Sequence, residues 1–398
     1  MERDGNIKVI IHRGASQIGG VCTEVSTYDT RIFFDLGTPL EGEGNQNKLS
    51  VEGLTYGDQN ADAVFLTHYY GDHVGEVPDI LPGIPVYMQR TARRILEAQQ
   101  KHKEILGQKV WAKEINELTE GAPLTIKDLT ITPLSSDHSA CDSLMYLIEG
   151  CGKRILITGD FRLHGYHSEE MKKTFEELGH IDLMISEGTN ITRESEKYYG
   201  EYWAEQRFSE IFKEYKYVFL LASSSNIERI AGFLRCAENG KYALTDKYQR
   251  ELMLIAKEYR MDDLIPEKIN YYSPNLDEKM ERRGFRFVVR ASEKFYPIVE
   301  KYFEDHPDET CLIYSMWSGY RDISSVKKML NYCDGKEKIV HVSGHVTKED
   351  LEDVLEAVKP DNLIIHHTSA EIDELKAIKI PEGTRLLEAE DGKVAYVK

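Results

Sequence analysis

The stretch AVFLTHYYGDHVGE, residues 63–76, carries the strongest local signal in the chain. It opens as an apolar strand and ends in a loop that holds His68, Asp72 and His73 close together. Imidazole nitrogens and carboxylate oxygens are the ligands that bind zinc or manganese and still leave room for a water. The stretch therefore predicts a metal site on a loop at the end of a β-strand.

Three other apolar runs end on similar side chains. They lead into Asp137-His138-Ser139, Thr158-Gly159-Asp160-Phe161 and Ile365-His366-His367-Thr368. A single histidine of this kind is more often a structural residue than a ligand. Four such loops after four strands instead favour metal binding at the rim of a sheet.

Short apolar runs alternate with amphipathic helical stretches along most of the chain, which is typical of an α/β protein. In the first part, strands are expected at 7–11, 21–27, 31–35, 63–68, 129–134, 144–150 and 154–160. From about residue 191, strands expected at 217–223, 286–290 and 310–315 alternate with helices expected at 224–239, 248–260 and 321–333. This alternation predicts an inserted doubly wound module.

The distribution of charge supports the same division. Residues 191–340 carry 25 basic and 26 acidic side chains, whereas the whole chain of 398 residues has a net charge of −18. The acidity therefore belongs to the flanking parts. We expect a first domain part over 1–190, an inserted domain over 191–340 and a returning part of the first domain over 341–398.

The composition favours a folded globular protein and argues against a secreted or membrane-spanning one. A hydrophobic content of 41% with 30% charged residues is typical of a folded globular chain. The opening MERDGNIKVI lacks a signal-peptide core, and no run approaches the roughly 18 apolar residues that cross a bilayer, so no membrane partner is expected. The six cysteines form no CxxC pair, which fits buried thiols in the cytoplasm.

Taken in order, seven segments resemble the metallo-β-lactamase superfamily and, within it, the β-CASP nucleases typified by ribonuclease J. HYYGDH (68–73), SDHSACDS (136–143) and ITGDFR (157–162) are similar to the first, third and fourth motifs. SEGTN (186–190), ASSSNIERI (222–230), SGHV (343–346) and IIHHTSAE (364–371) resemble the turn that opens the insert, a helix start inside it, the phosphate-binding turn and the segment of the last histidine. Their order and spacing make the resemblance specific.

This resemblance implies a fold, a metal centre and a reaction. The fold would be a metallo-β-lactamase αββα sandwich with an inserted doubly wound α/β domain, the β-CASP domain. The implied metal ligands are His68, Asp72, His73, His138, Asp160 and His367, with Asp160 between two ions. One or two ions per chain, zinc or manganese, would lower the pKa of water toward about 7 and supply hydroxide for phosphodiester hydrolysis.

One position departs from the family pattern. Tyr70 stands where the family has its second histidine, so the first ion would keep only His68, His138 and Asp160. A neutral phenol with a pKa near 10 is a poor ligand, although a metal can lower that pKa and bind the phenolate. The first site would thus be weak, completed through Tyr70, or completed by another residue.

Two further histidines follow Asp160 closely in the sequence. His164 and His167 are conceivable substitutes for the missing ligand. The alternative is that both are exposed loop histidines without a role, which is the commoner case.

The turn Ser343-Gly344-His345 is implied to bind the substrate phosphate. His345 would meet the scissile phosphate as a catalytic residue, with donors from Ser343 and the Gly344 backbone. The alternative is a helix N-cap, a pattern that Thr347 and Asp350 already satisfy.

The other implied contacts lie outside that turn. Asp72 is a second catalytic candidate, because it would orient the attacking water or bind metal. Ser225 and Asn226, at the helix start inside the insert, are implied phosphate-binding residues.

These observations lead to one main hypothesis and two alternatives. The main hypothesis is a cytoplasmic metal-dependent phosphodiester hydrolase, ribonuclease-like, acting on single-stranded RNA. The first alternative is a degenerate relative that binds nucleic acid or a protein partner without cleavage, and the second is a small-molecule metallohydrolase. A homo-oligomer is a further expectation.

The charge of the chain bears on nucleic acid as a substrate. A net charge of −18 opposes binding at long range, because phosphate neutralisation drives most non-specific association. The nearly neutral insert holds a basic run, Arg282, Arg283, Arg286 and Arg290. This run would either line a channel or form a solvated face.

Overall fold

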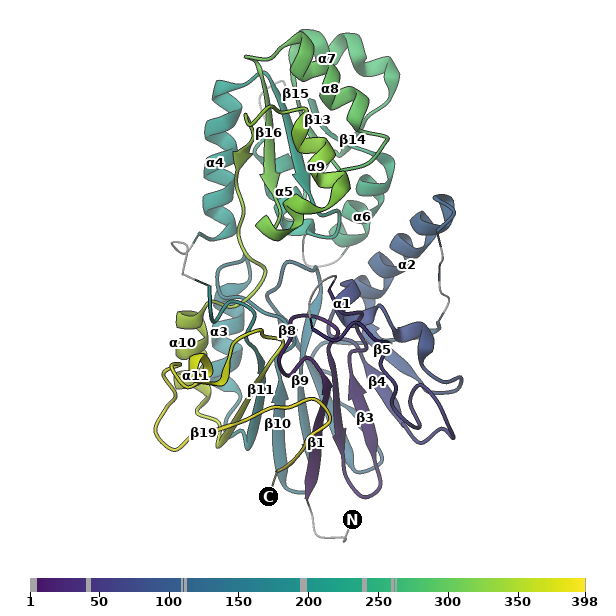
Figure 1. Ribbon diagram of the computed structural model, residues 1–398, viewed down its shortest axis with the longest axis vertical. Coiled ribbons are helices and arrows are strands. Elements are labelled where there is room, and N and C mark those ends of the chain that lie inside the picture. The colour runs from purple at the N-terminus through teal and green to yellow at the C-terminus, as the bar shows by residue number, and fades with distance from the viewer. Residues whose placement is uncertain are drawn as a thin grey trace. The chain divides into compact units, whose positions relative to one another are not determined.

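The computed structural model describes residues 6–40, 44–108, 110, 113–193, 199–237, 242–258, 261 and 263–397. The chain divides into two compact units (Figure 1). The first unit joins Met1–Lys197 to Gly344–Lys398, and the second is Tyr198–Ser343. The sequence predicted boundaries after residues 190 and 340, and these stay predictions. The boundaries between the two compact units fall after Lys197 and after Ser343.

The first unit contains two seven-stranded sheets, with orders β20-β1-β2-β3-β4-β5-β6 and β19-β18-β11-β10-β9-β8-β7 (Figure 1). The strands of the first sheet are β1 (Ile7–Arg13), β2 (Cys22–Ser26), β3 (Arg31–Phe34), β4 (Ala63–Phe65), β5 (Val86–Gln89), β6 (Ile115–Leu118) and β20 (Val394–Val397). Those of the second are β7 (Leu124–Ile126), β8 (Leu129–Ser136), β9 (Ser143–Gly150), β10 (Lys153–Ile157), β11 (Leu183–Glu187), β18 (Asn362–His366) and β19 (Arg385–Leu387).

Large apolar side chains fill the space between these two sheets. The ring of Phe34 on β3 lies 5.5 Å from that of Phe65 on β4 and 5.2 Å from that of Tyr146 on β9. The buried Tyr146 hydroxyl donates to the carbonyl of Leu66 at 2.6 Å, so the phenol keeps a hydrogen bond inside the core. The packed core thereby fixes the end of β4, where the loop that holds His68, Asp72 and His73 begins.

Helices cover the outer face of the second sheet. Phe175 of α3 (Ser168–Glu177) and Leu355 of α10 (Lys348–Val358) share an apolar cluster with Met184 on β11. The shorter elements of this unit are α1 (Gly71–Val74), η1 (Val77–Asp79) and α11 (Ile372–Leu375), and α2 (Arg90–Ile105) packs against β5 and β6 of the first sheet. The α/β class and the sandwich expected from the sequence are confirmed.

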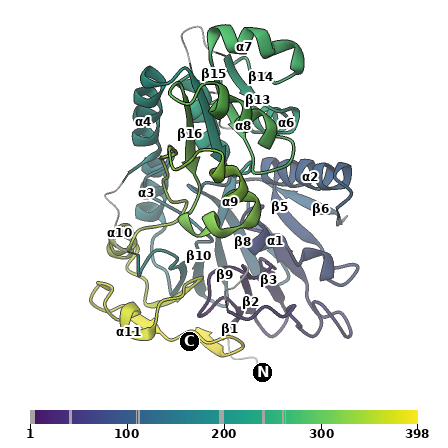
Figure 2. The same cartoon turned by 45° about the horizontal axis from the view of Figure 1, so that its top comes forward.

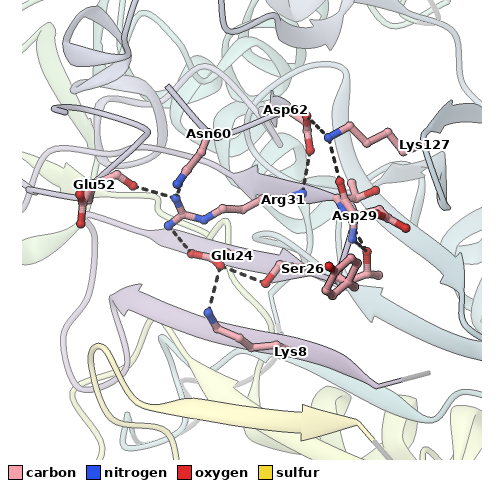
Figure 3. Close-up of a pocket in the computed structure, with 12 residues that line it drawn as sticks. Lys8, Glu24, Ser26, Asp29, Arg31, Glu52, Asn60, Asp62 and Lys127 are labelled. Carbon is pink, nitrogen blue, oxygen red and sulfur yellow. Dashed lines mark hydrogen bonds and ion pairs between the residues drawn. The ribbon is translucent and has the colours of Figure 1, made fainter. Parts of the chain in front are cut away.

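The outer face of the first sheet carries a polar depression (Figure 3). Glu24 of β2 lies in it and is fully buried. Its carboxylate contacts His12 at 2.8 Å and accepts from Arg31 at 2.8 Å and from Ser26 at 3.0 Å, and the ammonium of Lys8 lies 3.5 Å away. This buried charge is therefore compensated by its own neighbours.

The second unit is a six-stranded parallel sheet in the order β14-β13-β15-β12-β16-β17 (Figure 2). Its strands are β12 (Tyr217–Ala222), β13 (Tyr242–Thr245), β14 (Asn270–Tyr271), β15 (Phe285–Val289), β16 (Thr310–Ser315) and β17 (Lys338–Ile339). Its helices are α4 (Glu201–Glu214), α5 (Ile227–Arg235), α6 (Lys247–Lys257), η2 (Pro274–Leu276), α7 (Asp277–Arg283), α8 (Tyr296–Asp305), η3 (Ser318–Asp322) and α9 (Ser324–Asn331).

The strands of this sheet are buried on both faces. Phe219 of β12 belongs to an apolar cluster with Val299 of α8 and Met329 of α9. Its neighbours Val218 and Leu220, which point to the opposite face, are also fully buried. Continuous burial of this kind is characteristic of a parallel sheet covered by helices on both sides, as the sequence pattern predicts.

Some expected element boundaries are wrong. The helix expected over 224–239 begins at Ile227, because Asn226 caps it by accepting the backbone N–H of Arg229 at 3.1 Å. The strand expected over 63–68 ends at Phe65, where the chain turns into the metal-site loop. β5 and β6 were not predicted, because four residues show too little alternation.

The structure bears on two expectations from the sequence, the absence of a membrane partner and the burial of the cysteines. In the described part of the chain, no helix is both long enough and apolar enough to cross a membrane. All six cysteines have free thiols, and Cys151 is exposed rather than buried as expected.

Candidate metal centre

The loop after β4 is held in shape by the turn that follows β3. The backbone N–H of Leu36 donates to the carbonyl of His73 at 2.8 Å. Gly37 must lack a side chain, because a Cβ there would lie 1.6 Å from the carbonyl oxygen of Asp72. The two loops thus pack backbone against backbone, and this contact fixes where Asp72 and His73 point.

The carboxylate of Asp160, which follows β10, lies at the centre of a cluster of side chains. Its Oδ2 is 3.3 Å from His73 Nε2 and 3.9 Å from His68 Nε2. The Oδ2 atom of Asp72 is 3.5 Å from His367 Nε2 and 3.8 Å from His73 Nε2. The structure therefore brings five of the predicted metal ligands together.

Several atoms of this cluster lack hydrogen-bond partners. His68 Nε2, His73 Nε2, Asp160 Oδ2 and His367 Nε2 are all buried and make no hydrogen bond. Each unsatisfied buried atom of this kind costs about 1–3 kcal/mol. The ligand atoms of His68, His73 and Asp160 lie within 4.8 Å of one another, as do those of Asp72, His73 and His367. These residues fit a divalent cation, which would satisfy them together.

Each clustered histidine is held through its other ring nitrogen. Asp35 Oδ2 lies 2.8 Å from His73 Nδ1, and Thr189 Oγ1 lies 2.7 Å from His367 Nδ1. The hydroxyl of the residue before His68 lies 3.0 Å from its Nδ1. Such contacts orient the rings and leave Nε2 free to act as a metal ligand.

Asp35 and Thr189 were not among the site residues predicted from the sequence. Asp35 ends a strand-forming run, so polar residues at the ends of buried strands were the signal that could have found it. Its φ of 59° and the φ of 50° at His367 lie in the left-handed region. Backbone strain of this type clusters at functional sites.

Burial and neighbouring charges oppose each other in setting the pKa values. Burial alone would raise the pKa of Asp160, but His367 and His73 hold it well below its usual range. Burial would lower the pKa of His73, yet Asp160 and Asp35 raise it well above its usual value. Burial keeps the pKa of His68 well below its usual value, so this imidazole is neutral as a metal ligand must be.

His345 lies beside the cluster and is paired with a buried glutamate. Its Nδ1 is 3.1 Å from both carboxylate oxygens of Glu187 and 3.6 Å from Asp160 Oδ2. Burial would lower the pKa of His345, but Glu187 and Asp160 raise it to about 9. The imidazole is therefore protonated at neutral pH. Glu187 was not among the predicted site residues, although its segment was.

Tyr70 and His138 are occupied by other contacts. The hydroxyl of Tyr70 lies 3.0 Å from Ser139 Oγ, and His138 Nδ1 lies 2.6 Å from the carbonyl oxygen of Gly344. Burial lowers the pKa of His138 to about 3. Among the described residues, His138 joins none of the groups of three or more potential ligand atoms within 4.8 Å. Its assignment as a ligand stays a prediction.

Three of the predicted phosphate-binding residues, Ser225, Asn226 and Ser343, belong to the second unit. The side chain of Asn226 is used as the cap of α5, and Ser225 Oγ lies 2.8 Å from Ser223 Oγ. Their contact with substrate remains a prediction.

The helix cap proposed near His345 is present. Thr347 accepts the backbone N–H of Asp350 at 3.1 Å and begins α10. The turn at 343–345 therefore precedes the helix, so capping does not occupy it.

The two substitute histidines stand apart from the cluster. His164 Nδ1 lies 3.5 Å from Asp350 Oδ2, and His167 Nδ1 lies 3.9 Å from a carboxylate oxygen of Glu170. Neither joins a ligand group among the residues that the structure describes.

Two of the four arginines in the basic run of the insert make structural contacts, whereas Arg282 and Arg283 are exposed. Arg286 is 2% exposed and donates to the carbonyls of Lys216 and Phe212 at 2.9 and 2.6 Å. Arg290 donates to Asp246 at 3.0 and 2.6 Å. For Arg286 both proposed roles, channel lining and solvated face, are wrong, because its guanidinium satisfies buried carbonyls.

Comparison with known proteins shows which families this chain is similar to. Residues 30–207 match the family described as beta-lactamase superfamily domain. Ribonuclease J of Helicobacter pylori (strain ATCC 700392 / 26695) is 22% identical over 389 residues, which cover 89% of this chain and 55% of that protein. Ribonuclease J of Mycoplasma genitalium is 23% identical over 409 residues, covering 90% and 67%. The chain spans about half the length of the first of these relatives.

A solved structure shares the fold. The crystal structure of a protein of unknown function from Enterococcus faecalis V583 has a TM-score of 0.80 and 21% sequence identity, and the match covers 98% of this chain and 100% of that one. The predicted resemblance is confirmed: residues 30–207 match the beta-lactamase superfamily domain, and the chain is similar to ribonuclease J over most of its length.

Proposed function

We propose that the chain is a metal-dependent phosphodiester hydrolase that cleaves single-stranded RNA. The observation that carries this proposal is the group of buried, unsatisfied ligand atoms around Asp160, with the protonated His345 beside it. A hydrolase of the β-lactamase superfamily needs both features, a cation to provide a nucleophile and an acid to protonate the leaving group.

Zinc or manganese would be held by His68, Asp72, His73, Asp160 and His367. A divalent ion bound there supplies hydroxide at neutral pH, because it lowers the pKa of water from about 15.7 toward about 7. Asp72 is the most accessible carboxylate of the group, with 15% of its side chain exposed against 2% for Asp160. We assign it the role of orienting the attacking water.

His345 would act as the proton donor. Glu187 holds its Nδ1, which leaves Nε2 to face a substrate. A pKa of about 9 keeps the ring charged at neutral pH, so it binds an anionic phosphate oxygen and gives a proton to the leaving oxygen. In the β-CASP resemblance the turn 343–345 is the phosphate-binding turn, with His345 meeting the scissile phosphate.

RNA is the proposed substrate because of the ribonuclease J relatives. The net charge of −18 works against association at long range, and a bound cation offsets part of it. We also propose a cytoplasmic setting, which the six free cysteines support. A homo-oligomer stays a prediction.

The test is cleavage by metal-free protein before and after addition of Mn²⁺ or Zn²⁺. Labelled single-stranded RNA, DNA of the same sequence and a small phosphodiester are compared as substrates. We expect metal-dependent cleavage of RNA, abolished in Asp160→Asn and unchanged in the exposed control Asp58→Asn. Cleavage of the small phosphodiester alone would favour the small-molecule alternative. RNA binding without cleavage would favour the degenerate relative.

A further inference from the structure

We propose that this chain binds a single divalent ion, and that the hydroxyl groups of Tyr70 and Ser139 close the neighbouring position to a second ion. The inference rests on the proposed metal centre. It departs from the paired ions that the family resemblance implies, and it is drawn from how the polar atoms around His68 are satisfied.

These polar atoms fall into two sets. On one side, His68 Nε2, His73 Nε2, Asp160 Oδ2 and His367 Nε2 are buried without a hydrogen bond, and the ligand atoms of His68, His73 and Asp160 lie within 4.8 Å of one another. On the other side, the hydroxyls of Tyr70 and Ser139 lie 3.0 Å apart. No side-chain atom of these two residues is among the buried atoms that lack a partner. A cation is therefore required by the first set and not by the second.

The second set is also closely packed. The ring centroid of Tyr70 lies 5.0 Å from that of His68 and 5.4 Å from that of His138, with edge-on contacts to both. A Cβ on Gly344 would lie 2.4 Å from Ser139 Oγ and 3.1 Å from the Cε1 of His138. The phenol ring, the hydroxyl and the backbone of Gly344 thus fill the space that an ion and its waters would need.

Charge leads to the same conclusion. The three side chains described above as contacts of Tyr70, which are His68, His138 and Ser139, carry no carboxylate, whereas the residues facing His367 include both Asp72 and Asp160. A second ion on the Tyr70 side would share the single charge of Asp160 and otherwise meet only neutral groups. A neutral phenol would have to lose its proton to act as a ligand.

The test is the number of ions bound by metal-free, full-length protein titrated with Mn²⁺ in a calorimeter, checked by elemental analysis after desalting. We expect one ion for the wild type, one for Tyr70→Phe and two for Tyr70→His, which restores an imidazole beside His68. Thermal unfolding of each variant verifies that it is folded.

The number of bound ions distinguishes a failure of the single-ion inference from a failure of the proposed metal centre. Two ions on the wild type, with loss of both in Asp160→Asn, would overturn the single-ion inference and leave the metal centre standing. No ion on the wild type would overturn the centre itself. One ion on both the wild type and Tyr70→His would show that Tyr70 does not close the second position.

A spectroscopic readout tests the role of the phenol directly. Protein loaded with Cu²⁺ should show no phenolate-to-copper absorption band that depends on residue 70, so wild type and Tyr70→Phe should have the same visible spectrum. A band present in the wild type and lost in Tyr70→Phe would identify Tyr70 as a ligand and overturn the proposal.

Discussion

Two buried carboxylates of the first unit, Glu24 and Asp160, are held in opposite ways. Glu24 accepts from Arg31 at 2.8 Å, and Lys8 lies 3.5 Å from it (Figure 3). It also contacts His12 at 2.8 Å. Asp160 is buried as deeply, but its Oδ2 makes no hydrogen bond. The fold provides hydrogen-bond partners for both oxygens of the first carboxylate, whereas the second keeps an unsatisfied oxygen that a bound cation would satisfy.

The different environments of Glu24 and Asp160 distinguish a structural charge cluster from a functional one. Both clusters contain histidine and a buried acid, so residue type does not separate them. What separates them is the partner of each polar atom. Both oxygens of Glu24 have hydrogen-bond partners, whereas Asp160 Oδ2 and the Nε2 atoms of His68, His73 and His367 have none. A group of buried atoms without partners marks a site for a ligand.

The substitution Asp160→Asn tests the difference between the two carboxylates most directly. It removes the central charge of the cluster, so we expect loss of metal binding and of RNA cleavage. The wild type should gain about 2.7 kcal/mol of unfolding free energy when Mn²⁺ is present at 100 times its Kd, and the variant should gain nothing. Urea unfolding with Mn²⁺ or with chelator measures this gain. An equal gain in both proteins would place the ion elsewhere.

The reciprocal change is Glu24→Ala. It leaves the guanidinium of Arg31 and the ring of His12 without their partner in a buried place, and we expect a loss of about 3 kcal/mol in unfolding free energy. Metal content should not change. Glu388→Ala is the matched control, because Glu388 is 63% exposed and 3.7 Å from Lys376, so its removal should cost less than about 1 kcal/mol. Similar losses in the two variants would contradict the buried pairing.

Acid should destabilise the protein partly through Glu24. Burial would raise its pKa, but His12 and Arg31 hold it well below its ordinary value. A group with a lowered pKa in the folded state stabilises the fold above the unfolded pKa, near 4.3 for glutamate, and this stability is lost as the pH falls toward the folded value. Unfolding midpoints from pH 5 downward should therefore fall more steeply for the wild type than for Glu24→Gln, and parallel slopes would refute the assignment.

A smaller effect is expected from Gly344→Ala, which disturbs the boundary of the metal cluster without removing a ligand. The added methyl would press on Ser139 Oγ and move the turn that carries His345. We expect cleavage to fall by about tenfold, equivalent to about 1.4 kcal/mol in the barrier, with unchanged metal content. Gly71→Ala is a suitable control, since no atom lies within 4 Å of its added Cβ. Equal activities for the two variants would argue against close packing at Gly344.

Much of the fold and of the cluster was accessible from the sequence. Buried strands such as β10 and β12 are continuous apolar runs, and their burial leaves little freedom of assignment. His68 and Asp160 stand directly after such runs, where side chains meet at a sheet rim. The order of the motifs then indicated which of these loops belong together.

The remainder depends on contacts that no local pattern encodes. Tyr70 and Ser139 are 69 residues apart, so the hydrogen bond between their hydroxyls becomes visible only in the folded chain. Arg286 lies in a run of charge that resembles a surface, yet three backbone carbonyls bind it inside the second unit. Asp35 supports His73 from the turn that follows β3, and no sequence spacing links the two residues.

The smallest expected effect concerns a group away from the cluster around Asp160: His180, Asp182 and Asp361, whose potential ligand atoms also lie within 4.8 Å of one another. Here His180 is 61% exposed, and Asp182 is already paired with Lys153 at 2.8 Å and with the backbone N–H of Arg154 at 2.8 Å. Proximity of ligand types without unsatisfied atoms should not create a metal site. His180→Ala should therefore leave the number of bound Mn²⁺ ions unchanged and alter the unfolding free energy by less than about 0.5 kcal/mol. Loss of an ion in this variant would mean that exposed, paired groups can bind metal here, and the distinction drawn between Glu24 and Asp160 would then no longer identify the centre.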